Sequence, residues 1–160
     1  MPDQGWGAWD QSWVWSLLLI VFTIAIHAFG IVAIVPGLRW LHVGQSKRKG
    51  YFFHTHAGAV LVIAMTALAL AVLHSIECLL WAWVYLKLGA LPNPADAILY
   101  SVDSMATRGA SNLTLSNRWL LMGALEAADG MLLFGVSTAF LFTVMQRIAA
   151  TLGAGRYGGS

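Results

Sequence analysis

The chain has 160 residues, of which 59% are hydrophobic and only 10% are charged, and its net charge at pH 7 is +2. A soluble globular protein of this composition would have too few polar residues to cover its surface. Composition therefore excludes that class and predicts an integral membrane protein. We expect membrane lipids, and no nucleic acid, among its partners.

Three apolar runs are long enough to cross a bilayer, whose core of about 30 Å needs roughly 20 apolar residues in a helix. They are Trp13 to Val35, Ala57 to Leu86 and Trp119 to Met145. The first run is not expected to be a cleaved signal, because acidic residues but no Lys or Arg precede it. We therefore predict three transmembrane helices.

Basic and aromatic residues indicate the orientation. Basic side chains concentrate in the connection after the first run and in the tail after the third: Arg39, Lys47, Arg48, Lys49, Arg147 and Arg156. Because cytoplasmic loops favour Lys and Arg, we predict an external N-terminus and a cytoplasmic C-terminus. Trp81, Trp83 and Tyr85 are predicted to belong to an aromatic belt at the outer interface. We expect the membrane to be a bacterial inner (plasma) membrane.

A short helix is predicted between the second and third runs. Asn93 can cap a helix, Pro94 suits its first position, and Asp96 lies at the positive end of its dipole. A helix from Pro94 to Ala106 is too short to cross the membrane, at about 1.5 Å per residue. Its apolar stripe consists of Ile98, Leu99, Val102 and Met105. With both ends outside, this helix is either re-entrant, which predicts a cavity, or flat on the outer surface.

The residues of this short helix and of the loop after it carry a family resemblance. The run YSVDSMAT, from Tyr100 to Thr107, resembles the pore helix of potassium channels, in particular the bacterial two-helix pore type of the voltage-gated-like ion channel superfamily. The run LFGVSTAFL, from Leu133 to Leu141, resembles the family's inner helix. The loop residues that align with the family's Thr-Val-Gly-Tyr-Gly-Asp filter are Thr107, Arg108, Gly109, Ala110, Ser111 and Asn112.

The resemblance implies an all-α integral membrane fold with three transmembrane helices, a re-entrant pore helix and a loop, assembled as a homotetramer around a central axis. A pore domain at 51–150 would hold an outer helix at about 57–87, a pore helix at about 94–106, the filter-like loop at 107–112 and an inner helix at about 118–147. Residues 1–50 add an N-terminal transmembrane helix and a basic cytoplasmic connection. Residues 151–160 are expected to form a flexible cytoplasmic tail.

The filter-like loop departs from the family in ways that weaken selectivity. Only Gly109 of the two filter glycines remains, Ala110 lacks the aromatic ring that braces a filter, and Ser111 disfavours the positive φ that Gly reaches freely. We therefore expect a degenerate selectivity filter. The resemblance assigns Met131, Phe134, Thr138 and Phe140 to the cavity and gate. It assigns Gly130 to the hinge, although such a glycine also suits close helix packing.

Arg108 has two possible orientations. Directed at the axis, four guanidinium groups would form a positive ring that repels cations. Directed behind the filter, Arg108 would pair with Asp103, which satisfies both charges. We favour this pairing, because Asp103 and Arg108 are the only opposite charges in this region of the chain.

Five ionisable residues fall within the predicted spans: His27, His74, Glu77, Glu126 and Asp129. Such groups are costly to bury and normally pair with one another or face water. One interpretation is a metal or proton site built from His74, Glu77, Glu126 and Asp129. The other is interhelical hydrogen bonding, with His27 joining it. The sequence leaves both open, and no cofactor is expected.

Two functions from different classes follow. The first is an ion channel that passes monovalent ions with weak or no selectivity. The second is a non-conducting scaffold, sensor or regulatory membrane subunit that keeps the channel fold. We do not expect an enzyme, because no nucleophile and base occur together in a recognisable reaction motif.

Overall fold

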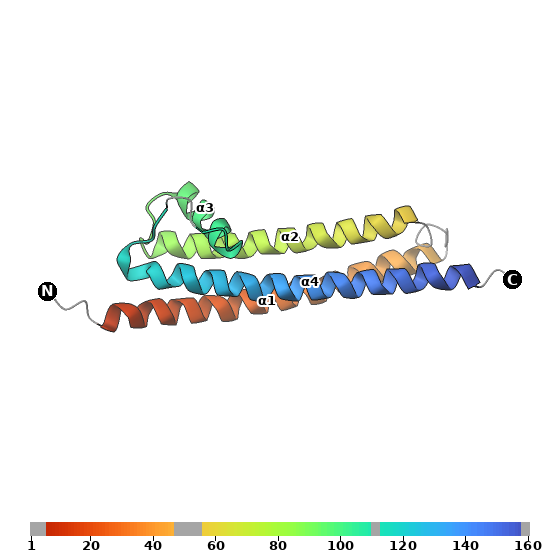
Figure 1. Ribbon diagram of the computed structural model, residues 1–160, viewed down its shortest axis with the longest axis horizontal. Helices are drawn as coiled ribbons and strands as arrows, with labels where there is room; N and C mark the ends of the chain where they lie inside the picture. Colours follow the sequence, from red (N-terminus) through yellow and green to blue (C-terminus); the bar gives the residue numbers. More distant parts are fainter. Residues whose placement is uncertain (1–5, 47–55, 110–112, 158–160) are drawn as a thin grey trace. The chain divides into compact units, whose positions relative to one another are not determined.

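The structure is a computed structural model that describes residues 6–46, 56–109 and 113–157, with side chains at 11–37, 56–109 and 113–152. Its elements are α1 (Trp6–Ser46), α2 (His56–Lys87), α3 (Pro94–Met105), the short 3-10 helix η2 (Asn117–Trp119) and α4 (Leu120–Tyr157) (Figure 1). All regular secondary structure in the described ranges is helical. Three residues of the predicted filter-like loop lie outside these ranges: Ala110, Ser111 and Asn112.

Three helices contain segments long and apolar enough to span a membrane: Gln11–Gly37, His56–Lys87 and Asn117–Leu152. These segments confirm the three predicted spans and make the chain an all-helical, membrane-embedded protein. The ends differ from expectation, because α4 continues to Tyr157. Residues 151–157, predicted as part of a flexible tail, are therefore helical. Gly and Thr residues there do not end the helix, since no Pro interrupts it.

The chain divides into two compact units. The first consists of residues 1–27 and 74–134, and the second of residues 28–73 and 135–160. In the second unit, a Cβ added at Gly30 of α1 would lie 2.7 Å from Leu73 Cδ2 of α2, so the glycine allows these two helices to approach closely. The first unit contains α3 and the loop that follows it.

The core of the first unit is built around aromatic side chains of α2. Trp81 and Tyr85 are fully buried, whereas Trp83 is 56% exposed. Trp81 and Tyr85 therefore do not belong to the aromatic belt predicted for all three residues. At helical spacing of four, they face the other helices of the unit, and the intervening Trp83 faces away.

The short helix α3 begins as predicted. The Asn93 side chain caps it by accepting a hydrogen bond from the backbone N–H of Ala95 at 3.0 Å, and Pro94 occupies the first turn. Several of its polar side chains are buried, whereas most of the predicted apolar stripe is exposed. The exposed residues are Ile98, Leu99 and Val102, and the buried ones include Ser101, Asp103, Ser104 and Met105.

Helix α3 lies against both α2 and α4. Ser101 Oγ lies 2.8 Å from the Cys78 carbonyl oxygen of α2. On α4, a Cβ at Gly130 would lie 2.3 Å from the backbone oxygen of Met105. Cys78 is more than two helical turns inside the end of α2, about 14 Å at 1.5 Å per residue. The C-terminal end of α3 therefore reaches well into the length of both spanning helices.

A second glycine of α4 supports the same contact. A Cβ at Gly123 would lie 2.0 Å from the Tyr100 hydroxyl oxygen, so the ring of Tyr100 occupies the space that a larger side chain would need. Burial raises the pKa of the Tyr100 phenol, which keeps this group neutral. Gly123 and Gly130 are thus sites of close approach between α3 and α4.

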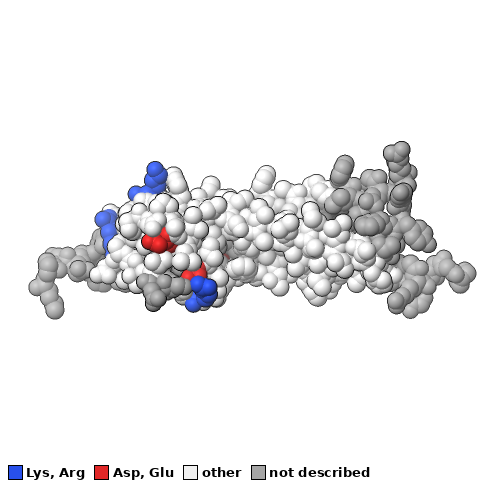
Figure 2. Space-filling model, turned by 90° about the horizontal axis from the view of Figure 1, so that it is seen from above, with Lys and Arg blue, Asp and Glu red and all other residues white. Residues whose placement is uncertain are grey.

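On the face that Figure 2 shows, the visible Lys, Arg, Asp and Glu side chains of the described residues lie in the part of the first unit that carries α3. Most of the other described residues on this face are uncharged. An uncharged surface of this kind suits the apolar interior of a bilayer.

Candidate functional site

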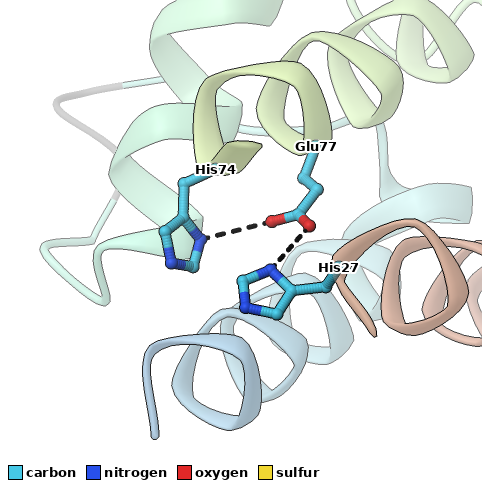
Figure 3. A group of neighbouring side chains, drawn as sticks. All are labelled: His27, His74 and Glu77. Carbon is cyan, nitrogen blue, oxygen red and sulfur yellow. Dashed lines mark hydrogen bonds and ion pairs between the residues drawn. The ribbon is translucent and has the colours of Figure 1, made fainter. Parts of the chain in front are cut away.

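Three of the five predicted intramembrane ionisable residues form one group. Glu77 Oε1 lies 2.8 Å from His27 Nδ1, and Glu77 Oε2 lies 3.2 Å from His74 Nδ1 (Figure 3). All three residues are buried, and Glu77 is fully so. His74 and Glu77 share a face of α2 because they are three residues apart, and His27 reaches them from α1.

The two imidazole rings are held in place by ring contacts. The His74 ring stacks on Phe134 of α4, with centroids 4.2 Å apart and an interplanar angle of 20°. The His27 and His74 rings lie 5.0 Å apart at 46°. These contacts restrict rotation of both rings and keep their Nδ1 atoms directed at Glu77.

Asp129 joins all three long helices of the first unit. Its Oδ2 accepts hydrogen bonds from Thr23 Oγ1 of α1 at 2.7 Å and from Trp81 Nε1 of α2 at 3.3 Å. Its Oδ1 is buried and has no hydrogen-bond partner within the described residues. One oxygen of a fully buried carboxylate is therefore left without a donor.

Glu126 ties α3 to α2 and α4. Its Oε2 accepts a hydrogen bond from the Tyr85 hydroxyl at 2.6 Å, and its Oε1 accepts one from the Ser101 hydroxyl at 2.5 Å. Glu126 is fully buried, so these donors replace the water that the carboxyl group loses. Glu126 is thus one of the contacts that position the short helix.

The predicted metal or proton set of His74, Glu77, Glu126 and Asp129 does not form one group in the described chain. Ligand atoms of His27, His74 and Glu77 lie within 4.8 Å of one another, and Glu126 and Asp129 are outside that group. Both of those carboxylates take part in interhelical hydrogen bonds instead, as the second interpretation expected. His27 belongs to the group because α1 packs against α2.

Sequence reasoning missed the donors that hold the two carboxylates of α4: Thr23, Trp81, Tyr85 and Ser101. A weak signal existed for three of them. Thr23 is four residues before His27, and Trp81 and Tyr85 follow Glu77 at steps of four, so each shares a helix face with an ionisable residue. Ser101 had no such signal, because its role depends on how α3 packs.

The loop after α3 contains the predicted ion pair. Arg108 Nη2 lies 2.9 Å from Asp103 Oδ1 and 3.1 Å from Asp103 Oδ2. The Asp103 side chain is 3% exposed and that of Arg108 is 65% exposed. The pairing of Arg108 with Asp103 that we favoured is therefore present in the chain.

A double-mutant cycle measures this pair. We expect Arg108→Gln and Asp103→Asn each to lower the free energy of unfolding, and the double variant to lose less than the sum of the two, by about 0.5–1 kcal/mol. Reversible unfolding in mixed micelles provides the free energies. Strict additivity of the two changes would show that the pair makes no contribution to stability.

Thr107 closes α3 in a conformation that normally selects glycine. Its φ is 54°, its N–H donates to the Ser104 carbonyl at 2.9 Å, and the Arg108 N–H donates to the Asp103 carbonyl at 2.9 Å. These two bonds form a Schellman motif with a threonine in the left-handed position. A β-branched residue is strained there, and such strain often occurs at functional loops.

We therefore expect Thr107→Gly to stabilise the fold by about 0.5–1 kcal/mol, because glycine relieves the left-handed strain and loses part of the gain through its freer unfolded state. Thr107→Ala, which keeps a Cβ, is the matched control and is expected to gain less. Thermal unfolding of the purified variants measures both changes. If the glycine variant is less stable than the parent protein, the Thr107 backbone is not strained.

The residues predicted for the cavity and gate lie on the outer faces of α4. Met131 is 60% exposed and Phe134 is 45% exposed, Thr138 is exposed, and Phe140 is half-buried. Phe134 also stacks on His74, as described above. Helix α4 passes through Gly130 without interruption.

Comparison of the chain with protein-family models, with curated proteins and with solved structures finds no match. Two features of the geometry bear most directly on function. One is the short helix α3, whose C-terminal end lies against α2 and α4. The other is the buried polar network beside it.

Proposed function

We propose that the chain is an ion channel-like membrane protein of the potassium-channel superfamily. Four copies form a pore in which residues 107–112 act as a non-standard filter with weak or no selectivity among monovalent ions. The observation that supports this function best is the depth of α3, whose last residue, Met105, packs against Gly130.

The path of the chain after α3 supports a pore. After Met105, which lies against Gly130 well inside the α4 span, the backbone is no longer helical. At Ser116 the chain is close to the end of α2 again, because the Ser116 N–H donates a hydrogen bond to the Ala90 carbonyl at 3.4 Å. Within a bilayer, backbone of this kind is tolerated only when protein buries it or water lines it. A central pore formed by several copies meets that requirement.

The exposed face of α3 supports assembly or lipid contact on that side. Ile98, Leu99 and Val102 are each more than 40% exposed, while the polar residues of the same helix are buried. A helix resting flat on the surface would turn this apolar face toward the membrane and its polar face toward water. In the chain, the polar face is instead used to bind α2 and α4 through Ser101.

The loop chemistry supports weak selectivity. Arg108 is bound to Asp103, so its charge is held back from a central ion path. Gly109, with a φ of 80°, has the left-handed conformation that aims a filter carbonyl, but the sequence offers no second glycine before residue 123. One or two rings of oxygen ligands are then available to ions, too few for strong discrimination.

Ion flux from liposomes tests the proposed function. We expect purified protein to pass potassium and sodium at comparable rates when gradients of potassium, sodium and chloride are applied separately, with less chloride flux. Glu126→Ala protein, which loses the hydrogen bonds that join α3 to Glu126, serves as a control in which we expect lower flux. Absence of flux for every ion, in liposomes that contain folded protein, would overturn the channel proposal. A non-conducting scaffold, sensor or regulatory subunit would then account for the fold.

A triple change in the loop tests the filter correspondence. The variant restores three features of the family's filter. Arg108→Val restores the apolar side chain that faces away from the filter, Ala110→Tyr the bracing aromatic ring, and Ser111→Gly the second glycine. We expect the ratio of potassium to sodium flux to rise relative to the parent protein. A variant that assembles normally with an unchanged ratio would show that residues 107–112 do not form the filter.

A further inference from the structure

We propose that His27, His74 and Glu77 bind one divalent transition-metal ion of the Zn²⁺ class, an inference that does not depend on the proposed pore. The three residues come from two helices of the first unit and present two imidazole nitrogens and a carboxylate toward a common point (Figure 3). Two histidines with one carboxylate are a frequent ligand set for zinc and related ions.

The distances suit an ion with small side-chain movements. His27 Nδ1 and His74 Nδ1 lie 2.8 Å and 3.2 Å from the two oxygens of Glu77, and all ligand atoms lie within 4.8 Å of one another. Ligand atoms bound tetrahedrally at about 2.0–2.2 Å from zinc are roughly 3.3–3.5 Å apart. An ion between the three residues would therefore separate these contacts by less than about 1 Å.

The charge of the surrounding helices favours a bound cation. Glu77 and Asp129 are fully buried carboxylates, and Asp129 is near enough to interact electrostatically with Glu77 and His27. No Lys or Arg occurs in Gln11–Gly37, in α2 before Lys87, or in α4 before Arg147. With no Lys or Arg beside them, these two carboxylates can take positive charge only from the imidazoles or from a bound cation. A divalent ion supplies it, and imidazole ligands favour a transition metal over calcium or magnesium.

The incomplete hydrogen bonding of these carboxylates is an independent observation. Glu77 Oε2 and Asp129 Oδ1 are both buried and lack a hydrogen-bond donor among the described residues. Glu77 Oε2 forms an ion-pair contact with His74 Nδ1 at 3.2 Å. Oxygens in this state offer lone pairs to an ion. Asp129, fixed by Thr23 and Trp81, is placed to add negative charge beside it.

Metal binding to the purified full-length chain tests the proposal. Protein stripped with a chelator is titrated with Co²⁺, and its visible d–d absorption is recorded before Zn²⁺ is added. We expect one Co²⁺ per chain, displacement by one equivalent of Zn²⁺, and a higher melting temperature with Zn²⁺. Absence of stoichiometric binding by folded parent protein would overturn the proposal.

Variants locate the ion. We expect His27→Gln, His74→Gln and Glu77→Gln to lose the Co²⁺ spectrum, and Asp129→Asn to weaken binding about 10-fold to 100-fold as a supporting residue. His56→Gln, an exposed histidine at the start of α2, is the matched control and should bind as the parent does. Binding that persists in folded His27→Gln and His74→Gln protein would overturn the assignment.

X-ray absorption at the zinc edge gives a readout that does not depend on how the variants fold. Zinc-loaded parent protein is expected to show nitrogen and oxygen ligands with the outer-shell scattering of two imidazoles. A sulfur ligand would place the ion at Cys78, and fewer than two imidazoles would place it outside the three-residue group. Either result would overturn the proposal.

Discussion

Replacing Gly130 with alanine should destabilise the folded chain by about 2–3 kcal/mol and displace α3. The added Cβ would lie 2.3 Å from the Met105 backbone oxygen and 2.9 Å from its carbonyl carbon and Cα. These are backbone atoms, so no side chain can rotate to relieve the clash and the end of the helix must move. Reversible unfolding in mixed micelles, followed by circular dichroism, measures the loss.

Gly135→Ala is the matched control for this change. Gly135 is on the same helix, but a Cβ there meets no atom within 4 Å. Its replacement should be neutral or stabilising, by up to about 1 kcal/mol, because alanine favours the helix. If the two variants lose the same stability, the close approach of α3 to α4 is absent. Liposome flux per folded protein should fall for Gly130→Ala and stay unchanged for Gly135→Ala.

Removal of the Glu126 carboxyl group is expected to have the second large effect. Glu126→Ala deletes the hydrogen bonds from Tyr85 and Ser101 and leaves both hydroxyls in a buried cavity. Each interhelical hydrogen bond in a membrane protein contributes about 0.6–1.7 kcal/mol, and the cavity adds about 1 kcal/mol. We therefore expect a loss of about 2–4 kcal/mol in the free energy of unfolding, measured in the same micelles.

Two further variants separate hydrogen bonding from packing at this position. Glu126→Gln keeps the side-chain volume and a carbonyl acceptor, so it should lose less than Glu126→Ala. Tyr85→Phe removes one donor and should lower the stability of the parent protein; in the Glu126→Ala background it should recover part of the lost stability, because it removes a buried hydroxyl that has lost its acceptor. If Tyr85→Phe has the same effect in both backgrounds, Glu126 and Tyr85 are not coupled.

Features that depend on local sequence were predictable. Helix length and apolar composition predicted the three spans, and the Asn-Pro-Ala-Asp run predicted the start of α3 at Pro94. The ion pair of Asp103 with Arg108 was also accessible, because its members are five residues apart at the end of one short helix. In each case the determining contacts lie within a few turns of the chain.

Burial and hydrogen-bond partners that depend on which helix faces pack together were not predictable from the sequence. Trp and Tyr are the residue types typical of the membrane–water interface, yet Trp81 and Tyr85 are buried in the core, where they donate hydrogen bonds to carboxylates of α4. In a membrane, apolar residues suit both the core and the lipid face, so hydrophobicity does not tell which side of a helix is buried. Of the apolar stripe predicted on α3, Ile98, Leu99 and Val102 are exposed and Met105 is buried, together with the polar residues Ser101, Asp103 and Ser104.

The candidate site shows the same division. Spacing of three residues placed His74 with Glu77, and Glu126 with Asp129, each pair on one helix face. Spacing gives no information about the element opposite, so it could not assign His27 to the first pair or Ser101 to Glu126. Those partners depend on how α1 and α3 pack against the other helices, and local spacing in the sequence does not determine this packing.

An electron cryo-microscopy map of the protein in lipid nanodiscs tests the proposed assembly most directly. We expect four chains around one axis, with the loops that follow α3 converging on the axis and the Arg108 side chain directed at Asp103. Fewer than four chains, or α3 facing lipid with its loop away from any axis, would contradict the proposed pore.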